Sequence, residues 1–359
     1  MAVNTAIDKK EKSLKIFNRA DRFPQGWYWA LPSHELRERK AYGVTLLGRD
    51  LVLYRNERGE PVAMDAYCPH AGAALADGKV EQGKIQCSLH GRQFDESGRC
   101  IAITGQSSTN LSVQTWPTAE KYGLIWVWVG ELVSEPLSPS QSDRSPSLPE
   151  LPNIPELSSS STIDKCSFHL SNSFSRQCHP NVVLINAIDA NHFNSVHNLP
   201  LEIRFETERL SQNAVQFSNT TRGGEASRFV RLIRPWYKEA VTYQMCYWYG
   251  STGTVTLGPD FLHFYLMFAL RPAANGTTEG WTVLLTPERG GPFGGLFNRV
   301  LLGVTQLVAN YFAKGDREVF DSIRFDFRTP LAADSAISQF VKHVEQQRAI
   351  AWKTWRPIS

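Results

Sequence analysis

Length, composition and charge indicate an ordinary globular protein and exclude several other classes. The chain has 359 residues, 42% hydrophobic and 20% charged, which is enough for two packed domains and too apolar for a disordered protein. Its 38 basic and 35 acidic residues give a net charge of +3, which is too mild to indicate nucleic-acid binding.

The start of the chain and its cysteines bear on the compartment. Residues 1–23 form a polar, lysine-rich arm without the apolar core of a signal peptide. The six cysteines are too sparse for a disulfide scaffold, and two stand beside histidines at metal-ligand spacing, which fits a reducing compartment. We therefore expect a cytoplasmic protein.

Residues 24–133 are predicted to form a β-rich domain. Turn residues such as Asp77-Gly78 and Ser97-Gly98 separate short runs of strand composition. These runs begin at Val44, Leu51 and Leu124. The pattern is typical of a small antiparallel sandwich or barrel.

Two short motifs in this domain have the residue types of a metal cluster site. They are Cys68-Pro-His70 and Cys87-Ser-Leu-His90, with sixteen residues between them. A Rieske [2Fe–2S] centre replaces two thiolates on one iron with two imidazoles, so each of two loops must supply one Cys and one His. The motifs therefore predict a cluster with Cys68 and Cys87 on one iron and His70 and His90 on the other.

The same residue types also suit other kinds of site. Two Cys and two His also suit tetrahedral zinc, but zinc fingers more often pair Cys with Cys and His with His. A further alternative is that these Cys and His side chains are ordinary core residues that bind no metal. Two Cys and two His rarely coincide at this paired spacing by chance. We also expect Gly72 and Gly91 to bring backbone N–H groups close to the cluster sulfurs.

Residues 134–162 are dense in Ser and Pro and are predicted to be an extended linker without a packed core. Residues 163–359 then mix helical and strand-like patterns, which favours an antiparallel sheet with helices to one side, an α+β domain. Helical periodicity is expected over 182–196, 296–325 and 333–352. Strand-like runs are expected at 214–217, 229–233, 242–249, 261–270 and 281–285.

An apolar stretch within the second of these helical segments bears on membrane contact. Val300–Ala313 is shorter than a membrane span and contains Gln306 and Asn310. A buried or amphipathic helix is the favoured interpretation, and we expect no integral membrane span. A peripheral membrane contact stays open.

The first helical segment of the second domain contains two histidines, His192 and His197, preceded by Asp189. Non-haem Fe(II) oxygenases bind iron through two His and one carboxylate on one face of the metal. A spacing of five residues is off-face by about 140° on an ideal helix, so His197 must lie at a distorted turn or helix end.

The chain resembles a known family at these motifs. The run YCPHAGAALADGKVEQGKIQCSLHGRQFDESGRC is similar to the Rieske domain of Rieske non-haem iron oxygenases. Respiratory-type Rieske proteins carry a disulfide between the cluster loops, and those positions here are Ala73 and Leu89. The run 186–197 resembles the catalytic-helix pattern Asn-x2-Asp-x2-His-x4-His of the same family.

The resemblance implies a fold and a set of cofactors. The fold is an N-terminal all-β Rieske [2Fe–2S] domain followed by an antiparallel-sheet, helix-grip (START-like) catalytic domain. The cofactors are one [2Fe–2S] cluster and one Fe(II) per subunit. The family's third iron ligand is a downstream Asp, for which Asp316 matches best and Asp321 is the runner-up. Gly315 stands where the family usually has Gln or Glu.

The resemblance also implies an electron path. In the family, the residue matching Asp189 bridges a cluster histidine, here His90, and an iron histidine, here His192. The bridge forms across the subunit boundary of a head-to-tail trimer. Electrons come from a ferredoxin or an NAD(P)H-dependent reductase, because the chain has no strand-linked GxGxxG motif of its own.

The expected activity is that of a terminal oxygenase, a mono- or dioxygenase that hydroxylates, desaturates or dealkylates its substrate with O2. The start DAYCPH and the stretch 313–331 look most like steroid-hydroxylating members, which suggests a small apolar substrate with a bulky ring system. Residues 243–249 and 261–270, with His263 and Met267, are candidates to line its pocket. The alternatives are a Rieske electron carrier or redox sensor without oxygenase activity, and a zinc-stabilised binding module.

Overall fold

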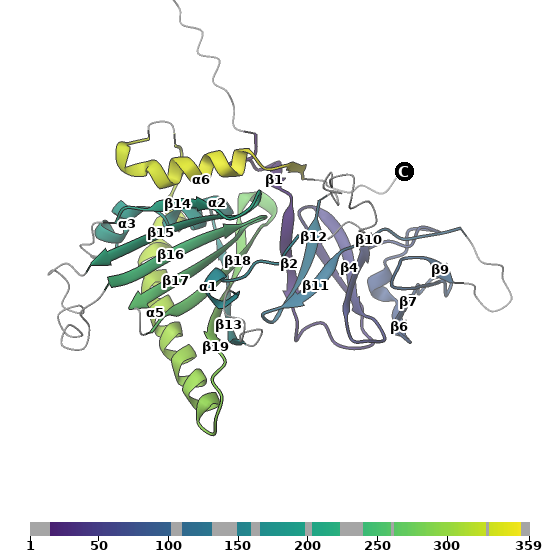
Figure 1. Cartoon of the computed structure of the whole chain (residues 1–359). Helices are drawn as coiled ribbons and strands as arrows, with labels where there is room; N and C mark the ends of the chain where they lie inside the picture. The colour runs from purple at the N-terminus through teal and green to yellow at the C-terminus, as the bar shows by residue number, and fades with distance from the viewer. Residues whose placement is uncertain are drawn as a thin grey trace, which may run out of the picture.

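The structure is a computed structural model that describes residues 15–101, 110–130, 149–158, 166–197, 203–222, 240–259, 262–327 and 330–352. Small sheets gather at one end of the molecule, and one large sheet with its helices forms the other end (Figure 1). The expected strand at 229–233 lies outside the described residues, as do 134–148 and 159–162 of the expected linker.

Three small antiparallel sheets form the N-terminal unit. The first contains β10 (Thr115–Trp116), β5 (Pro61–Asp65), β4 (Arg49–Arg55) and β3 (Tyr42–Leu46). The second contains β11 (Thr118–Lys121), β12 (Leu124–Val129) and β2 (Gly26–Pro32). The third contains β6 (Lys79–Glu81), β7 (Lys84–Gln86), β8 (Gln93–Phe94) and β9 (Cys100–Ile101). Alternate residues of β4 and β12, such as Leu51 and Ile125, fill one shared core, as period-2 alternation requires.

The large sheet of the second unit has seven antiparallel strands. Their order is β13 (Cys166–Arg176), β19 (Thr278–Pro287), β18 (Phe264–Pro272), β17 (Thr252–Pro259), β16 (Ala240–Trp248), β15 (Val215–Arg222) and β14 (Glu206–Arg209). Neighbouring registers place Phe217 opposite Met245, Met245 opposite Val255, and Val255 opposite Leu266. These side chains share one face of the sheet and build its larger core.

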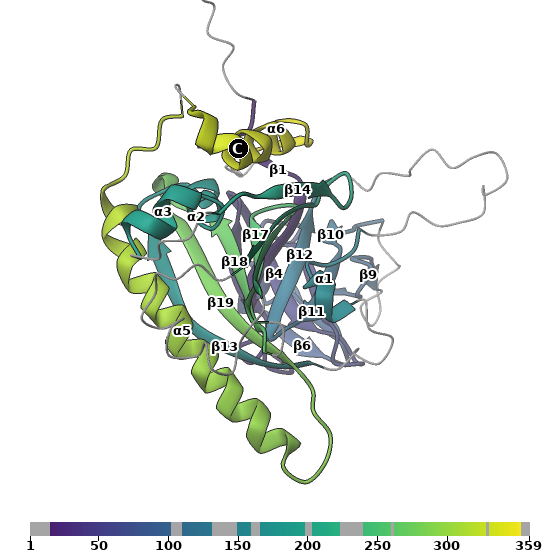
Figure 2. The same ribbon diagram turned by 60° about the vertical axis from the view of Figure 1, so that its left-hand side comes forward.

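Helices cover that face of the large sheet (Figures 1 and 2). They are α2 (Pro180–Asn186), α3 (Ala190–Ser195), α5 (Gly294–Ser322) and α6 (Ser335–Glu345). Short 3-10 turns lie at Leu75–Asp77, Ala274–Gly276 and Ala332–Asp334. Apolar side chains of α2 and α6, among them Leu184 and Phe340, are buried against the strands. The expected α+β class is confirmed.

The opposite face of the large sheet packs against the N-terminal unit. Met267 and Val283 pair across β18 and β19 and join Trp27 and Trp126 of the other unit in one core. The guanidinium of Arg271 donates to the carbonyl of Ala30 at 2.8 Å across the same boundary. The two units are therefore held together by a continuous apolar interface.

Part of the expected linker also belongs to this interface. Residues 149–158 include the short helix α1 (Pro155–Ser158), and Ile154 and Leu157 are buried against the tryptophans of the N-terminal unit. This part of the Ser/Pro-rich segment is packed rather than extended, because its few apolar side chains join the core shared by the N-terminal unit and the large sheet. The domain boundaries themselves remain a prediction.

Two helical segments differ from their expected limits. The expected segment 182–196 is broken into α2 and α3, because Asp189 has extended backbone geometry and caps α3. The last expected helix ends at Glu345, and Ala349–Ala351 instead forms β20, which pairs with β1 (Arg22–Pro24). No helix among the described residues has the length and apolarity needed to cross a bilayer.

Candidate metal centres

The first cluster loop is a tight hairpin at residues 68–73. A bridge between Tyr67 and Ala74 closes its base. Within it, the N–H of Cys68 donates to the carbonyl of Ala73 at 2.8 Å, and the N–H of Gly72 donates back to the carbonyl of Cys68 at 2.8 Å. Gly72 has a φ of +74°, which is a conformation that glycine adopts at little cost.

The second cluster loop, residues 87–92, repeats this geometry at the same offsets. The pair Gln86 and Gln93 closes its base. The N–H of Cys87 donates to the carbonyl of Arg92 at 2.8 Å, and the N–H of Gly91, with φ +67°, donates to the carbonyl of Cys87 at 3.0 Å. In this structure the two glycine N–H groups close their own loops, whereas the backbone N–H groups of His70 and Ala71 lower the pKa of the Cys68 thiol against the larger effect of burial.

The two loops bring the four expected ligands together, with the two cysteines in the interior and the two histidines at the surface. Cys68 and Cys87 are buried, whereas His70 and His90 are exposed, with ring centroids 4.7 Å apart. Burial raises the pKa of the Cys68 thiol, so a thiolate there needs a cationic partner. Two buried thiols below two exposed imidazoles fit a cluster whose histidine side faces a partner.

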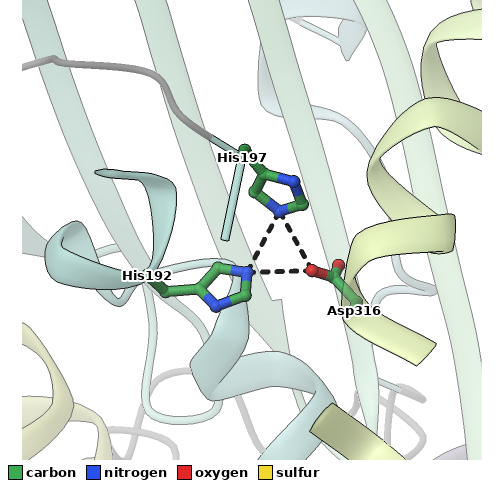
Figure 3. Close-up of side chains that lie close together, drawn as sticks. All are labelled: His192, His197 and Asp316. Atoms are coloured by element: carbon green, nitrogen blue, oxygen red, sulfur yellow. Dashed lines mark hydrogen bonds and ion pairs between the residues drawn. The ribbon is translucent and has the colours of Figure 1, made fainter. Parts of the chain in front are cut away.

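A second group of possible metal ligands comes from two helices of the large-sheet unit and from the turn that follows the first of them (Figure 3). His192 lies on α3, His197 follows two residues after the end of α3, and Asp316 lies on α5. Both histidines are buried, and the Asp316 side chain is largely buried. The position of His197 beyond the helix end agrees with the distortion expected from its five-residue spacing.

The three ligand atoms form a nearly equilateral triangle. Nε2 of His192 lies 3.0 Å from Nε2 of His197, and each nitrogen lies 2.9 Å from Oδ1 of Asp316. A metal about 2.1 Å from three ligands at right angles separates them by about 3.0 Å, whereas tetrahedral angles give about 3.4 Å. The spacing thus fits one face of an octahedron, the arrangement used by two-His-one-carboxylate iron sites.

The surroundings of this triad favour an ionised carboxylate. Burial alone would raise the pKa of Asp316, but hydrogen bonds with His192 and His197 outweigh it and lower the pKa to about 2. Asp321, the alternative third ligand, is about half-exposed and lies 3.7 Å from Arg317 on its own helix. Of the two candidates, the structure brings Asp316 to the histidines.

Gly315 has a steric role beside the triad. A Cβ at this position would lie 3.2 Å from Cγ1 of Val196 and 3.3 Å from the His197 ring. The side chain that the resembling family usually has before its Asp would press on this histidine. The close packing beside His197 is therefore a physical reason for glycine, rather than Gln or Glu, at position 315.

Aromatic residues that sequence reasoning did not single out enclose His197. The Phe312 ring lies 4.8 Å from the His197 ring at an interplanar angle of 77°, and the hydroxyl of Tyr311 donates to the His197 carbonyl at 3.4 Å. Phe312 precedes Asp316 by four positions on one helix, so this spacing could have predicted their shared face. Tyr243 packs against Phe193 on the sheet side.

The expected pocket residues divide between the two faces of the sheet. Tyr243 packs on Phe193, which contacts both histidines of the triad, and Leu266 belongs to the same core cluster as Tyr243. Met267 instead lies in the interface core with the N-terminal unit, so it cannot line a pocket at the triad. Strict alternation along β18 decides this, and the sequence run alone could not place the two faces.

Asp189 has a local function in the chain. Its Oδ1 accepts hydrogen bonds from the backbone N–H groups of Asn191 at 3.0 Å and His192 at 3.2 Å, which caps α3. The carboxylate thereby fixes the start of the helix that carries His192. The cluster loops and α3 lie at opposite ends of the molecule (Figures 1 and 2).

Comparison with known proteins agrees with this geometry. The Rieske [2Fe-2S] domain family matches residues 26–117. Aminopyrrolnitrin oxygenase PrnD of Pseudomonas fluorescens is 32% identical over 201 residues, which are 54% of this chain and 51% of that protein. Cholesterol 7-desaturase nvd of Bombyx mori is 31% identical over 182 residues, 50% of this chain and 36% of that protein.

A solved structure matches the fold over most of the chain. The NdmA QL mutant of Pseudomonas putida CBB5, solved with caffeine, superposes with a TM-score of 0.63 at 18% identity, covering 89% of this chain and 88% of that one. At this identity the likeness establishes the fold. The chain spans about half the length of the first curated relative and about a third of the second.

The matches show a Rieske [2Fe-2S] domain at residues 26–117. Over about half of its length the chain is similar to proteins named as an oxygenase and a desaturase, and it shares the fold of a solved structure over most of its length.

Proposed function

We propose that this chain is the terminal oxygenase component of a Rieske system. One observation carries the proposal: three ligand atoms of His192, His197 and Asp316 lie 2.9–3.0 Å apart in a chain that also contains a Rieske domain. A simple electron carrier has no use for a second buried triad of this geometry.

The residues at the two centres have distinct parts in the proposal. Cys68, His70, Cys87 and His90 hold the cluster, and the triad holds Fe(II). When bound, the cluster supplies single electrons and the iron supplies the position at which O2 reacts. The partly buried ring of Phe312 packs on His197 and orients it, and the partly buried ring of Tyr243 packs on Phe193 and limits the access of water to the triad.

The proposed electron path crosses between subunits. The cluster loops and α3 lie at opposite ends of the folded molecule. We therefore infer a head-to-tail homotrimer in which His90 of one subunit meets Asp189 of the next. A carboxylate that accepts from two imidazole N–H groups fixes both tautomers and couples their charge states. Asp189 is already hydrogen-bonded to the backbone N–H of His192, which orients it for this part.

The substrate class and partners follow from the same reasoning. We propose a small apolar substrate with a bulky ring system and O2 as co-substrate, with no part for nucleic acid. The relatives are named as acting on aminopyrrolnitrin and on cholesterol, which supports apolar ring systems. Electrons come from a ferredoxin or an NAD(P)H-dependent reductase in the cytoplasm. The reaction that we propose is a hydroxylation, desaturation or dealkylation of this substrate with O2, and the enzyme is a monooxygenase or a dioxygenase.

Metal analysis separates this function from an electron carrier. The purified, iron-loaded chain is expected to hold about three iron atoms and two labile sulfides, and His192→Ala about two irons with unchanged sulfide. With chemically reduced protein, O2 and a panel of apolar ring compounds, oxidised products should form with wild type and not with His192→Ala. Two irons per wild-type chain would instead favour a carrier, and zinc without sulfide would favour a binding module.

A mixed-subunit experiment tests the trimer. Two inactive variants are co-expressed: His192→Ala, which keeps the cluster, and Cys87→Ser, which keeps the triad. If electrons cross a head-to-tail boundary, random trimers regain about a quarter of wild-type turnover, because one junction in four joins an intact cluster to an intact triad.

Metal analysis of each parent variant is the control for this mixture. His192→Ala must retain labile sulfide, and Cys87→Ser must retain the iron of the triad. Turnover that stays at the level of the separate parents, in mixtures whose mass is trimeric, would contradict transfer between subunits.

A further inference from the structure

The long helix α5 exposes a continuous apolar face. Its N-terminal half extends beyond the edge of the large sheet (Figures 1 and 2). The face consists of Phe293, Leu296, Phe297, Val300, Val304, Leu307 and Tyr311, all of which are exposed. Leu307 is 70% exposed and Phe293 74%, so these side chains are not partly covered core residues. An apolar surface of this extent marks an interaction site.

The exposed face is separate from the face of α5 that packs on the protein. Gly294, Asn298, Leu301 and Thr305 are buried on the sheet side. Asn298 donates from Nδ2 to the hydroxyl of Ser167 on β13, which anchors this half of the helix. The helix is therefore held in place by one face while a second apolar face remains free for a partner.

The charges that the residues between Glu288 and Asp316 contribute along this face are of one sign. Between Glu288 and Asp316 the charged residues are Arg289, Arg299 and Lys314, and no acidic residue occurs. Arg299 and Lys314 are exposed and stand three positions after Leu296 and Tyr311, so each lies beside the apolar face on the helix surface. The complement of this surface is apolar and anionic.

We propose that the exposed face of α5 docks on an anionic membrane surface. A helix that lies in the interface combines an apolar face with flanking Lys and Arg and carries aromatic side chains at headgroup level, as Phe293, Phe297 and Tyr311 would here. Pairing of α5 with the same helix of a second copy would bring only like charges together. The membrane therefore fits the charge pattern better than the pairing of two α5 faces.

Docking in this way has a consequence for the proposed oxygenase. The face ends at Tyr311, whose hydroxyl donates to the carbonyl of His197, so the membrane would lie next to the triad. Apolar ring compounds partition into bilayers. The iron site would then lie beside the membrane in which such substrates are dissolved. This consequence rests on the proposed function, whereas the docking itself does not.

Vesicle binding tests the docking without any turnover measurement. The iron-loaded full chain is floated with vesicles of phosphatidylcholine containing about one-third phosphatidylglycerol, and with phosphatidylcholine alone. We expect binding to the anionic vesicles that weakens at high salt, and a loss of affinity of about tenfold or more in Val300→Gln/Leu307→Gln. Arg299→Glu/Lys314→Glu should weaken binding to anionic vesicles selectively.

Leu331→Gln is the matched control, because Leu331 is also 70% exposed but lies outside α5. It should bind vesicles as wild type does. Absence of binding to anionic vesicles, or equal binding by wild type and the α5 variants, would overturn the proposal. So would a change of oligomer mass by light scattering in Val300→Gln/Leu307→Gln without vesicle binding by wild type, which would assign the face to a second copy. A chain that binds vesicles but forms no product would leave the docking intact and refute only the oxygenase.

Discussion

An Asp189→Asn variant is expected to lose about 100-fold or more in turnover while it keeps its three irons, its sulfide and its stability. The reason lies in the two functions of this side chain. Asparagine caps helices about as well as aspartate, so the hydrogen bonds to the N–H groups of Asn191 and His192 can persist. Its side chain has one acceptor oxygen and a donor amide, so it cannot accept from imidazoles on both sides.

The control for this experiment is Asp189→Ala. Alanine removes the cap as well, which should cost about 1 kcal/mol of stability in thermal or urea unfolding and loosen His192. Single-turnover kinetics with a pre-reduced cluster measure the rate at which the cluster is reoxidised by O2 and substrate. If Asp189→Asn reoxidises its cluster at the wild-type rate, Asp189 is a helix cap and has no part in electron transfer.

Replacement of Asp316 by alanine is expected to reduce turnover below about 1% of wild type and to remove one iron per chain, leaving the cluster intact. Asp316 contributes the oxygen atom that closes the triangle with His192 and His197. Two neutral imidazoles alone hold Fe(II) weakly. Iron analysis, labile-sulfide analysis and the visible spectrum of the cluster measure the two centres separately.

Asp321→Ala is the matched control for that variant. It removes the same side chain from the same helix, five residues further on, where Asp321 is exposed and faces Arg317. Iron content and turnover should stay at the wild-type level. A loss of iron in Asp321→Ala together with retention in Asp316→Ala would reverse the assignment of the third ligand.

The local parts of both centres were predictable from sequence. The cluster motifs each lie within a few residues, and the structure closes both loops around Cys68 and Cys87 with the same pair of hydrogen bonds. The five-residue spacing of His192 and His197 predicted a helix end, and α3 ends at Ser195. Such short-range features follow from turn geometry and helix periodicity, which depend on neighbouring residues only.

Other features depended on contacts between distant segments and could not be read from the chain. Met267 and Leu266 are neighbours in sequence, yet one lies in the interface core and the other in the core beneath the helices. The cap role of Asp189 and the packing of Ile154 were also not predicted. In each case the residue type allowed several environments, and the arrangement of sheets selected one.

The sequence by itself predicted the ligands of the cluster and the two iron histidines, and the family resemblance gave Asp316 and Asp321 as candidates for the third ligand. The tertiary structure brings Asp316 to the histidines, because helix α5 must pack along β13 and β19 before one of its residues can reach α3. It also leaves the apolar face of α5 uncovered, whereas the sequence favours a buried or amphipathic helix there and leaves a peripheral membrane contact open. Periodicity states which side chains share a face, and only the packing of the whole chain decides which faces are buried.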